Sequence, residues 1–303
     1  EKSFEEIWNS KEAETFRNKI IKKDYSLCNT DICVGHIIDP KINTPDEIKK
    51  LKCHKLRLSY DINCNVACIT CRDKIINENK KEYEQIYNKL ETILQDIEEI
   101  QLSGAGDAFS SKHSRELIKK ISKNFPHIKF NIDTNGILFT QQEYEDFKLA
   151  GKINDLNISI PGFNKKTYDK IVINGNYDKL FRNLDFLINE KNKQNINNIM
   201  IIMVIHAINY KEMPLMSNYA KEKGIDVFYT CYQPWSNTIM AKKYDKMAIF
   251  KPKHPEYKKF LKVLESPSLQ ESHCRFEPFI EEIKFNNINK NNSLINKLLS
   301  FIK

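Results

Sequence analysis

Apolar positions follow two alternating patterns from about residue 55 onward. Short apolar runs typical of buried strands alternate with longer stretches in which apolar residues recur every three or four positions, as in amphipathic helices. The predicted strands are residues 55–61, 97–102, 128–134, 156–160, 199–205 and 226–229. The predicted helices between them are residues 81–96, 114–124, 141–150, 178–190 and 212–223.

This alternation predicts an α/β fold, because strands separated by helices pair in parallel through right-handed crossovers. Six such units are too few to close an eight-stranded barrel, so we expect a partial (β/α)6 barrel whose active site lies at the carboxyl ends of the strands. The expected organisation is an N-terminal cysteine-bearing segment (1–54), the barrel (55–235) and a C-terminal extension (236–303) with a basic tail.

Composition changes this picture little. Lys and Arg (48) exceed Asp and Glu (40), giving a net charge of +8, but the basic residues are scattered and form no stripe typical of nucleic-acid binding. No apolar run could span a bilayer and the first residues are charged, so we expect a cytoplasmic protein. Residues 293–303 could form a short amphipathic helix, which we expect to dock on the barrel rather than on a membrane. The missing initiator Met suggests a segment of a longer protein.

Three cysteines directly after the first predicted strand carry the strongest chemical signal. Cys64, Cys68 and Cys71 form a CxxxCxxC motif, and eight cysteines in a reducing compartment indicate metal binding rather than disulfides. Three thiolates on one loop can hold three irons of a cubane and leave the fourth iron open. A structural zinc site normally has four ligands in two pairs, so the motif favours an iron–sulfur cluster.

This triplet resembles the signature of the radical S-adenosylmethionine (SAM) superfamily. The resemblance implies that the open iron of a [4Fe–4S] cluster chelates the amino and carboxylate groups of SAM. It also implies that an external electron donor, such as flavodoxin or ferredoxin, drives cleavage of SAM to a 5′-deoxyadenosyl radical. Thr70 departs from the pattern, which commonly has an aromatic residue before the third cysteine, so adenine contacts are expected elsewhere.

A glycine-rich loop follows the second predicted strand, at Ser103, Gly104, Gly106 and Asp107. Small residues let backbone groups approach a ligand closely, although a plain turn has the same composition. The loop resembles the motif with which radical SAM enzymes bind the SAM amino group, with Asp107 in place of the usual Glu.

Two further strand ends carry polar residues. Thr134 and Asn135 precede Gly136 at the end of the third predicted strand. An Asn-Gly pair is first of all a turn signal. A Thr-Asn-Gly sequence at this strand end also resembles the one that lies near the cofactor pocket of radical SAM proteins. Ser159 shares one face of the fourth strand with Asn157, and it could bond the SAM ribose or carboxylate.

The remaining cysteines suggest a second cluster. Residues 7–10 with Arg17 and the segment around Cys28 and Cys33 resemble the auxiliary-cluster segment called SPASM or Twitch. By this resemblance Cys28, Cys33, Cys53 and Cys274 would bind an auxiliary [4Fe–4S] cluster, with His273 a possible substitute for Cys274. Free buried cysteines are the alternative.

Over most of its length the chain resembles bacterial radical SAM/SPASM proteins of surface-polysaccharide gene clusters. The resemblance implies hydrogen abstraction from a small or carbohydrate-type substrate, leading to dehydrogenation or epimerisation. Cys231 is a candidate hydrogen-atom donor and His206 a candidate base, but the residue types favour a core-packing role for each. A peptide maturase, a non-catalytic iron–sulfur electron carrier and a zinc-binding interaction module remain alternatives.

Overall fold

The computed structural model of the protein describes residues 3–27, 53–78, 85–102, 106–234, 238–285 and 287. The chain divides into two compact units. The first comprises Glu1–Leu56 and Lys80–Glu98, and the second comprises Arg57–Asn79 and Glu99–Lys303. The sequence-based boundaries at 54/55 and 235/236 stay a prediction.

The described part of the first unit is helical, with α1 (Phe4–Trp8), α2 (Lys11–Ile21) and α5 (Ile86–Glu91). The side chains of Ser3 and Ser10 accept backbone N–H groups of the first turns of α1 and α2, which is how serine N-caps stabilise helix starts. Arg17 donates to the carbonyl of Trp8 at 2.8 Å and lies over its ring, so the two helices are tied together.

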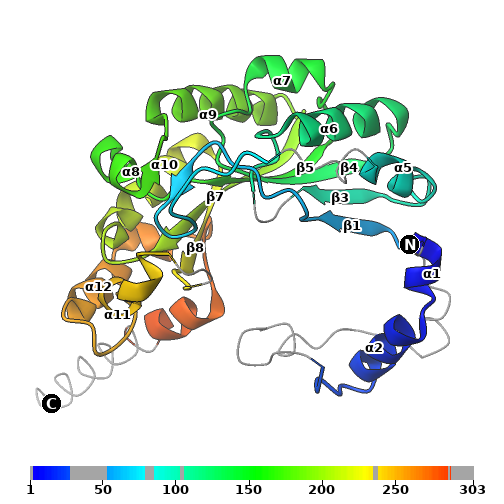
Figure 1. The fold of residues 1–303 in the computed structure, drawn as a ribbon. Coiled ribbons are helices and arrows are strands. Elements are labelled where there is room, and N and C mark those ends of the chain that lie inside the picture. The colour runs from blue at the N-terminus through cyan, green and yellow to red at the C-terminus, as the bar shows by residue number, and fades with distance from the viewer. Residues whose placement is uncertain are drawn as a thin grey trace, which may run out of the picture. The chain divides into compact units, whose positions relative to one another are not determined.

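The described part of the second unit contains a seven-stranded sheet (Figure 1). The boundary between the two units falls inside its first strand, β1, between Leu56 and Arg57. The strands stand in the order β1 (Lys55–Leu58), β3 (Glu99–Leu102), β4 (Lys129–Thr134), β5 (Ile153–Ser159), β7 (Ile196–Ile205), β8 (Asp226–Cys231) and β9 (Cys274–Phe276). Every pairing from β3 to β9 is parallel. This open parallel sheet confirms the predicted α/β class and is consistent with a partial barrel.

Helices α6 (Lys112–Asn124), α7 (Gln141–Asp146) and α9 (Tyr177–Asn192) cover one face of the sheet (Figure 1). The core lies between these helices and the strands, where every second strand residue, such as Phe130, Ile132 and Ile158, is fully buried. The other helices of this unit are α8 (Lys165–Ile171), α10 (Met213–Lys223), α11 (Tyr244–Met247), α12 (Tyr257–Leu264) and the short 3₁₀ helices η2 (Tyr210–Glu212), η3 (Ala241–Lys243) and η4 (Pro267–Gln270). No helix of the described residues is long and apolar enough to cross a membrane.

The opposite face, which we call the inner face, is polar on the central strands. Asn131 and Asp133 of β4 and Asp155 and Asn157 of β5 alternate with the buried apolar positions. A barrel-like sheet whose interior carries amides and carboxylates leaves room for a polar ligand rather than for a packed apolar core.

Several elements were not predicted from the sequence pattern. The seventh strand, β9, has only three residues, and a small antiparallel ribbon pairs β2 (Ala67–Cys68) with β6 (Val172–Ile173). Helices α1, α2, α8, α11 and α12 were not predicted either. Most of these segments carry too few residues to show a period, and tertiary contacts decide their conformation.

Candidate functional site

The cysteine loop leaves β1 and is held at several points by backbone hydrogen bonds. The N–H of Cys64 donates to the carbonyl of Ile76 at 3.0 Å, and Cys68 belongs to the β2–β6 ribbon. The N–H of Cys71 returns to the carbonyl of Cys68 at 2.8 Å in a tight turn. The loop is therefore fixed to two other segments, and its three thiols are set in position before any ligand binds.

The three thiols line one cavity of about 320 Å³, which we call the cysteine cavity. Its other walls are the carboxyl ends of β4, β5 and β7 and the loop that follows β3. The lining residues outside the cysteine loop include Gly106, Asp107, Asp133, Thr134, Asn135, Ser159, Pro161, Tyr168, Ile202 and Val204. This is the end of a parallel sheet at which ligands bind in α/β proteins.

All three thiols line the cysteine cavity. Among the described residues, no three His, Cys, Asp or Glu side chains are grouped so as to hold a single metal ion. A cubane does not require such a grouping, because each thiolate binds a different iron. The cavity and its three cysteines therefore fit a cluster better than a mononuclear site.

Burial favours the protonated thiols of Cys64 and Cys68 in the absence of metal. It raises the pKa of Cys68 to about 12, and the neighbouring Cys64 and Cys71 add to this shift. Burial likewise raises the pKa of Cys64. Because thiolates are the metal-binding form, iron binding at this loop must release protons.

Asp107 joins the loop after β3 to the end of β4. Its carboxylate accepts from the hydroxyl of Thr134 and the N–H of Asn135, both at 2.7 Å, and from the N–H of Phe109 at 3.0 Å. The side chain of Asn135 continues this chain of contacts, donating to the side-chain oxygen of Asn65 at 2.9 Å and lying 3.8 Å from the sulfur of Cys64. Two of the predicted motifs therefore meet the cysteine loop.

Gly106 is required by close backbone packing. A Cβ atom at this position would lie 2.3 Å from the carbonyl oxygen of Asn63, so a larger residue would push the loop after β3 away from the cysteine loop. Ser159 stands exposed at the end of β5 and lines the cavity, as the alternation along the strand predicted. Ser103 and Gly104 lie outside the described residues.

A family model described as the Radical SAM superfamily matches residues 62–230, more than half of the chain. The chain belongs to the radical SAM superfamily. Its members use a [4Fe–4S] cluster and SAM, which agrees with the cofactors predicted from the cysteine motif.

Individual relatives are more distant. The GTP 3′,8-cyclase of Synechocystis sp. is 26% identical over 203 residues, which cover 65% of this chain and 59% of that protein. The FeMo cofactor biosynthesis protein NifB of Methanocaldococcus infernus is 25% identical over 145 residues, covering 43% of this chain and 47% of that protein. The chain thus matches about half to three fifths of the length of these curated relatives. Among solved structures, methylornithine synthase aligns with 71% of this chain and 60% of its own, at 12% identity and a TM-score of 0.43.

The cysteines predicted for a second cluster are only partly described in this radical SAM protein. Cys28 and Cys33 lie outside the described residues. Cys53 belongs to the first unit, where its thiol contacts the carbonyl of Lys55 at 3.3 Å. The auxiliary cluster therefore stays a proposal for this chain.

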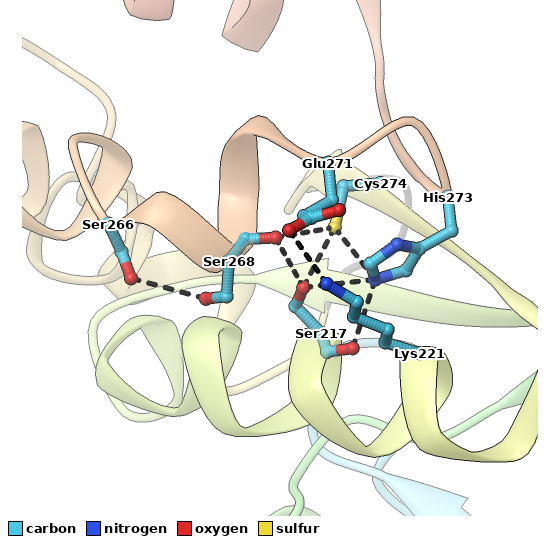
Figure 2. A network of polar contacts seen from close by, with 7 residues as sticks. All are labelled: Ser217, Lys221, Ser266, Ser268, Glu271, His273 and Cys274. Carbon is cyan, nitrogen blue, oxygen red and sulfur yellow. Dashed lines mark hydrogen bonds and ion pairs between the residues drawn. The ribbon is translucent and has the colours of Figure 1, made fainter.

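Cys274 lies in β9 of the second unit, within a polar network (Figure 2). Its sulfur is 3.0 Å from the hydroxyl of Ser217, 3.3 Å from the carbonyl of Ser268 and 3.5 Å from Nε2 of His273. The hydroxyl of Ser217 donates to the same carbonyl at 2.6 Å. The predicted substitute ligand, His273, thus directly contacts Cys274, and both side chains have protein partners in this structure.

The two catalytic candidates are not part of the cysteine cavity. Cys231 ends β8 at one of the buried positions of that strand, and burial, together with the nearby Glu277, raises the pKa of its thiol. His206 is fully buried, which lowers its pKa to about 4, and it stacks edge-on against Tyr232. Neither side chain lines the cavity, so their catalytic roles stay predictions without a contact here to support them.

The structure adds residues that the sequence analysis did not single out. Arg57 of β1, Arg72 after the cysteine loop and Asp133 of β4 all line the cavity. Arg72 donates to the carbonyl of Ile62 at 2.8 Å, which braces the loop. The alternation along β1 and β4 places Arg57 and Asp133 at inner-face positions. This alternation is the sequence feature from which both residues could have been predicted to line the cavity.

Proposed function

We propose that this protein is a radical SAM enzyme that abstracts a hydrogen atom from a small polar substrate bound on the inner face of the sheet. When bound, a [4Fe–4S] cluster with SAM supplies the 5′-deoxyadenosyl radical for that step. The observation that carries the proposal is that Cys64, Cys68 and Cys71 line one cavity with the strand-end residues Ser159 and Asp133.

The residues of the chain would hold, orient and shield the reacting groups. Cys64, Cys68 and Cys71 would ligate three irons, which leaves one coordination position for SAM. Ser159 offers a hydroxyl to polar groups of SAM, and Tyr168 supplies a buried wall of the cavity. An external electron donor such as flavodoxin or ferredoxin would reduce the enzyme.

The substrate class follows from the sequence resemblance and the polar inner face. We favour a carbohydrate-type substrate that undergoes dehydrogenation or epimerisation. A nucleotide is the second candidate, because Arg57 lines the cavity and a guanidinium group suits phosphate, and because one relative is a GTP 3′,8-cyclase.

The decisive experiment compares the anaerobically reconstituted protein with a variant in which Cys64, Cys68 and Cys71 are all changed to Ala. The wild-type protein should form 5′-deoxyadenosine from SAM under reducing conditions, and the triple variant should form none, because its irons lose all three protein ligands at this loop. The product is measured by liquid chromatography. Circular dichroism checks that the variant is folded, and 5′-deoxyadenosine formation by a folded triple variant would refute the proposal.

A further inference from the structure

Side chains of neighbouring strands, all of them polar except Met200, form two rows across the inner face, one after the other along the strands. The pairing register places the members of the first row opposite one another on β3, β4, β5 and β7: Gln101, Asn131, Asp155 and Asn198. The second row lies two residues nearer the carboxyl ends, on β4, β5, β7 and β8: Asp133, Asn157, Met200 and Asp226.

These rows line a second cavity, of about 400 Å³, which we call the row cavity. It includes all four members of the first row, together with Asn157, Met200 and Asp226 of the second. The remaining member of the second row, Asp133, lines the cysteine cavity. Asn157 donates to the carboxylate of Asp133 at 2.7 Å, so adjacent side chains of one row face the two cavities.

The same continuity appears along single strands. Asn157 of β5 lines the row cavity and Ser159 lines the cysteine cavity. Two residues on one face of a strand are only about 7 Å apart. The two cavities share no lining residue, but the contact between Asp133 and Asn157 makes them neighbours, and we call the two together the groove. Each falls in the size range of small-molecule sites.

The groove is rich in hydrogen-bond acceptors. Asp133 accepts amide hydrogens from Gln101 at 3.1 Å and from Asn157, and Asp155 accepts one from Asn198 at 3.0 Å. An ionised carboxylate has about four acceptor positions, so Asp133 and Asp155 can each accept further donors. At the end of the row cavity Arg275 pairs with Asp226, which neutralises that charge.

We propose that the groove binds a neutral, polyhydroxylated ring, whose hydroxyl groups donate to Asp133 and Asp155. Its reacting carbon then faces the cysteine cavity. This assignment rests on the proposed function and narrows its substrate class. Asp155 would repel an anionic group placed beside it, whereas Lys191 and Arg275 bring positive charge to other parts of the row cavity.

The test uses the reconstituted holoenzyme with SAM and a reductant. The rate of 5′-deoxyadenosine formation is measured alone and with myo-inositol, glucose or GTP. A neutral hydroxyl-rich probe, myo-inositol or glucose, should raise the rate. Asn198→Leu should raise the KM for that probe about tenfold, as expected for one lost hydrogen-bonding group in a binding site. Asp155→Asn, which keeps the size of the side chain, should also raise the KM.

Asn197→Leu is the matched control, because Asn197 is the preceding residue of β7 and does not line either cavity. It should leave the KM for the probe unchanged. The proposal is overturned if neither hydroxyl-rich probe raises the rate, if GTP alone does so, or if both Asn variants raise KM equally. Absence of SAM cleavage under all conditions would instead refute the proposed function, and the groove proposal with it.

Discussion

Asp107 replaces the Glu expected at the end of the glycine-rich loop, and its contacts give this residue a structural role. Its side chain is almost fully buried and accepts three hydrogen bonds, from Thr134, Asn135 and Phe109. Burial raises the pKa of the carboxyl group, while these hydrogen bonds oppose that shift. Asp107 thus holds the loop after β3 against the end of β4, where the cysteine cavity is formed.

Asp107→Ala should destabilise the protein without metal by about 3 kcal/mol, because buried donors lose their acceptor. Chemical denaturation monitored by circular dichroism measures this loss. Asp107→Asn should cost less, since one amide oxygen can still accept. Equal stability of the wild type and the Ala variant would show that the network contributes nothing.

His206 should make stability fall in acid. Its pKa is about 4 in the folded protein, against 6.5 for an unperturbed histidine. Its Nδ1 accepts the N–H of Ile208 at 3.2 Å, so protonation would break that bond as well as bury a charge. A lowered pKa favours the neutral form, so this stability is present above about pH 6.5 and is lost as pH falls toward 4.

Between about pH 7 and pH 5 the wild type should lose about 2 kcal/mol of unfolding free energy through this one group. His206→Gln should lose correspondingly less over the same range, measured by urea denaturation at both pH values. An identical pH dependence in the two proteins would exclude His206 as the source.

At the scale of elements, the short helix η2 fastens the loop between β5 and α8. The carboxylate of Glu212 accepts the N–H groups of Phe163 and Asn164 at 2.7 and 3.0 Å and also binds the hydroxyl of Thr167. Just before η2, Asn209 donates to the carbonyl of Pro161 at 2.7 Å. This clamp fixes the segment that carries the cavity wall from Ser159 to Pro161.

Glu212→Ala should therefore weaken SAM binding as well as stability. We expect a loss of about 3 kcal/mol of unfolding free energy from the unsatisfied donors. The dissociation constant for SAM, measured by calorimetry on the reconstituted enzyme, should rise because the wall is no longer fixed. Glu222→Ala is the control on the exposed side of α10 and should change neither quantity. If the Glu212→Ala variant binds SAM with the wild-type dissociation constant, the contacts of Glu212 contribute to folding stability but not to SAM binding.

At the scale of the whole molecule, the family match covers residues 62–230 and leaves both ends of the chain outside it. Three of the four cysteines proposed for an auxiliary cluster precede residue 62, and Cys274 follows residue 230. The iron content of this chain, with all eight cysteines present, therefore tests this proposal.

The reconstituted protein should contain about eight irons if both cubanes form, and the Cys64, Cys68 and Cys71 triple variant should keep about four. Iron and sulfide assays measure both. Cys231→Ala removes a buried cysteine outside the cavity and should keep the full count. About four irons in the wild type and none in the triple variant would show that the chain binds one cluster, and would contradict the proposed auxiliary cluster.

The sequence by itself determined the class of fold and the main chemical signal. The central strands were predicted with shifted ends, because their apolar alternation is local and repeats over several residues. The cysteine motif and its place after β1 need only sequence spacing to be recognised. Cys64, Cys68 and Cys71 line the cysteine cavity together with Ser159, and their roles stay predictions.

Only the tertiary structure decided which residues meet. It placed Cys231 and His206 away from the cavity, because the face toward which a strand-end residue points depends on pairing and on helix packing. It also brought Arg57 and Asp133 to the cavity and aligned the polar rows of the groove. Such contacts join residues far apart in the chain, so the local pattern of apolar and polar residues does not predict them.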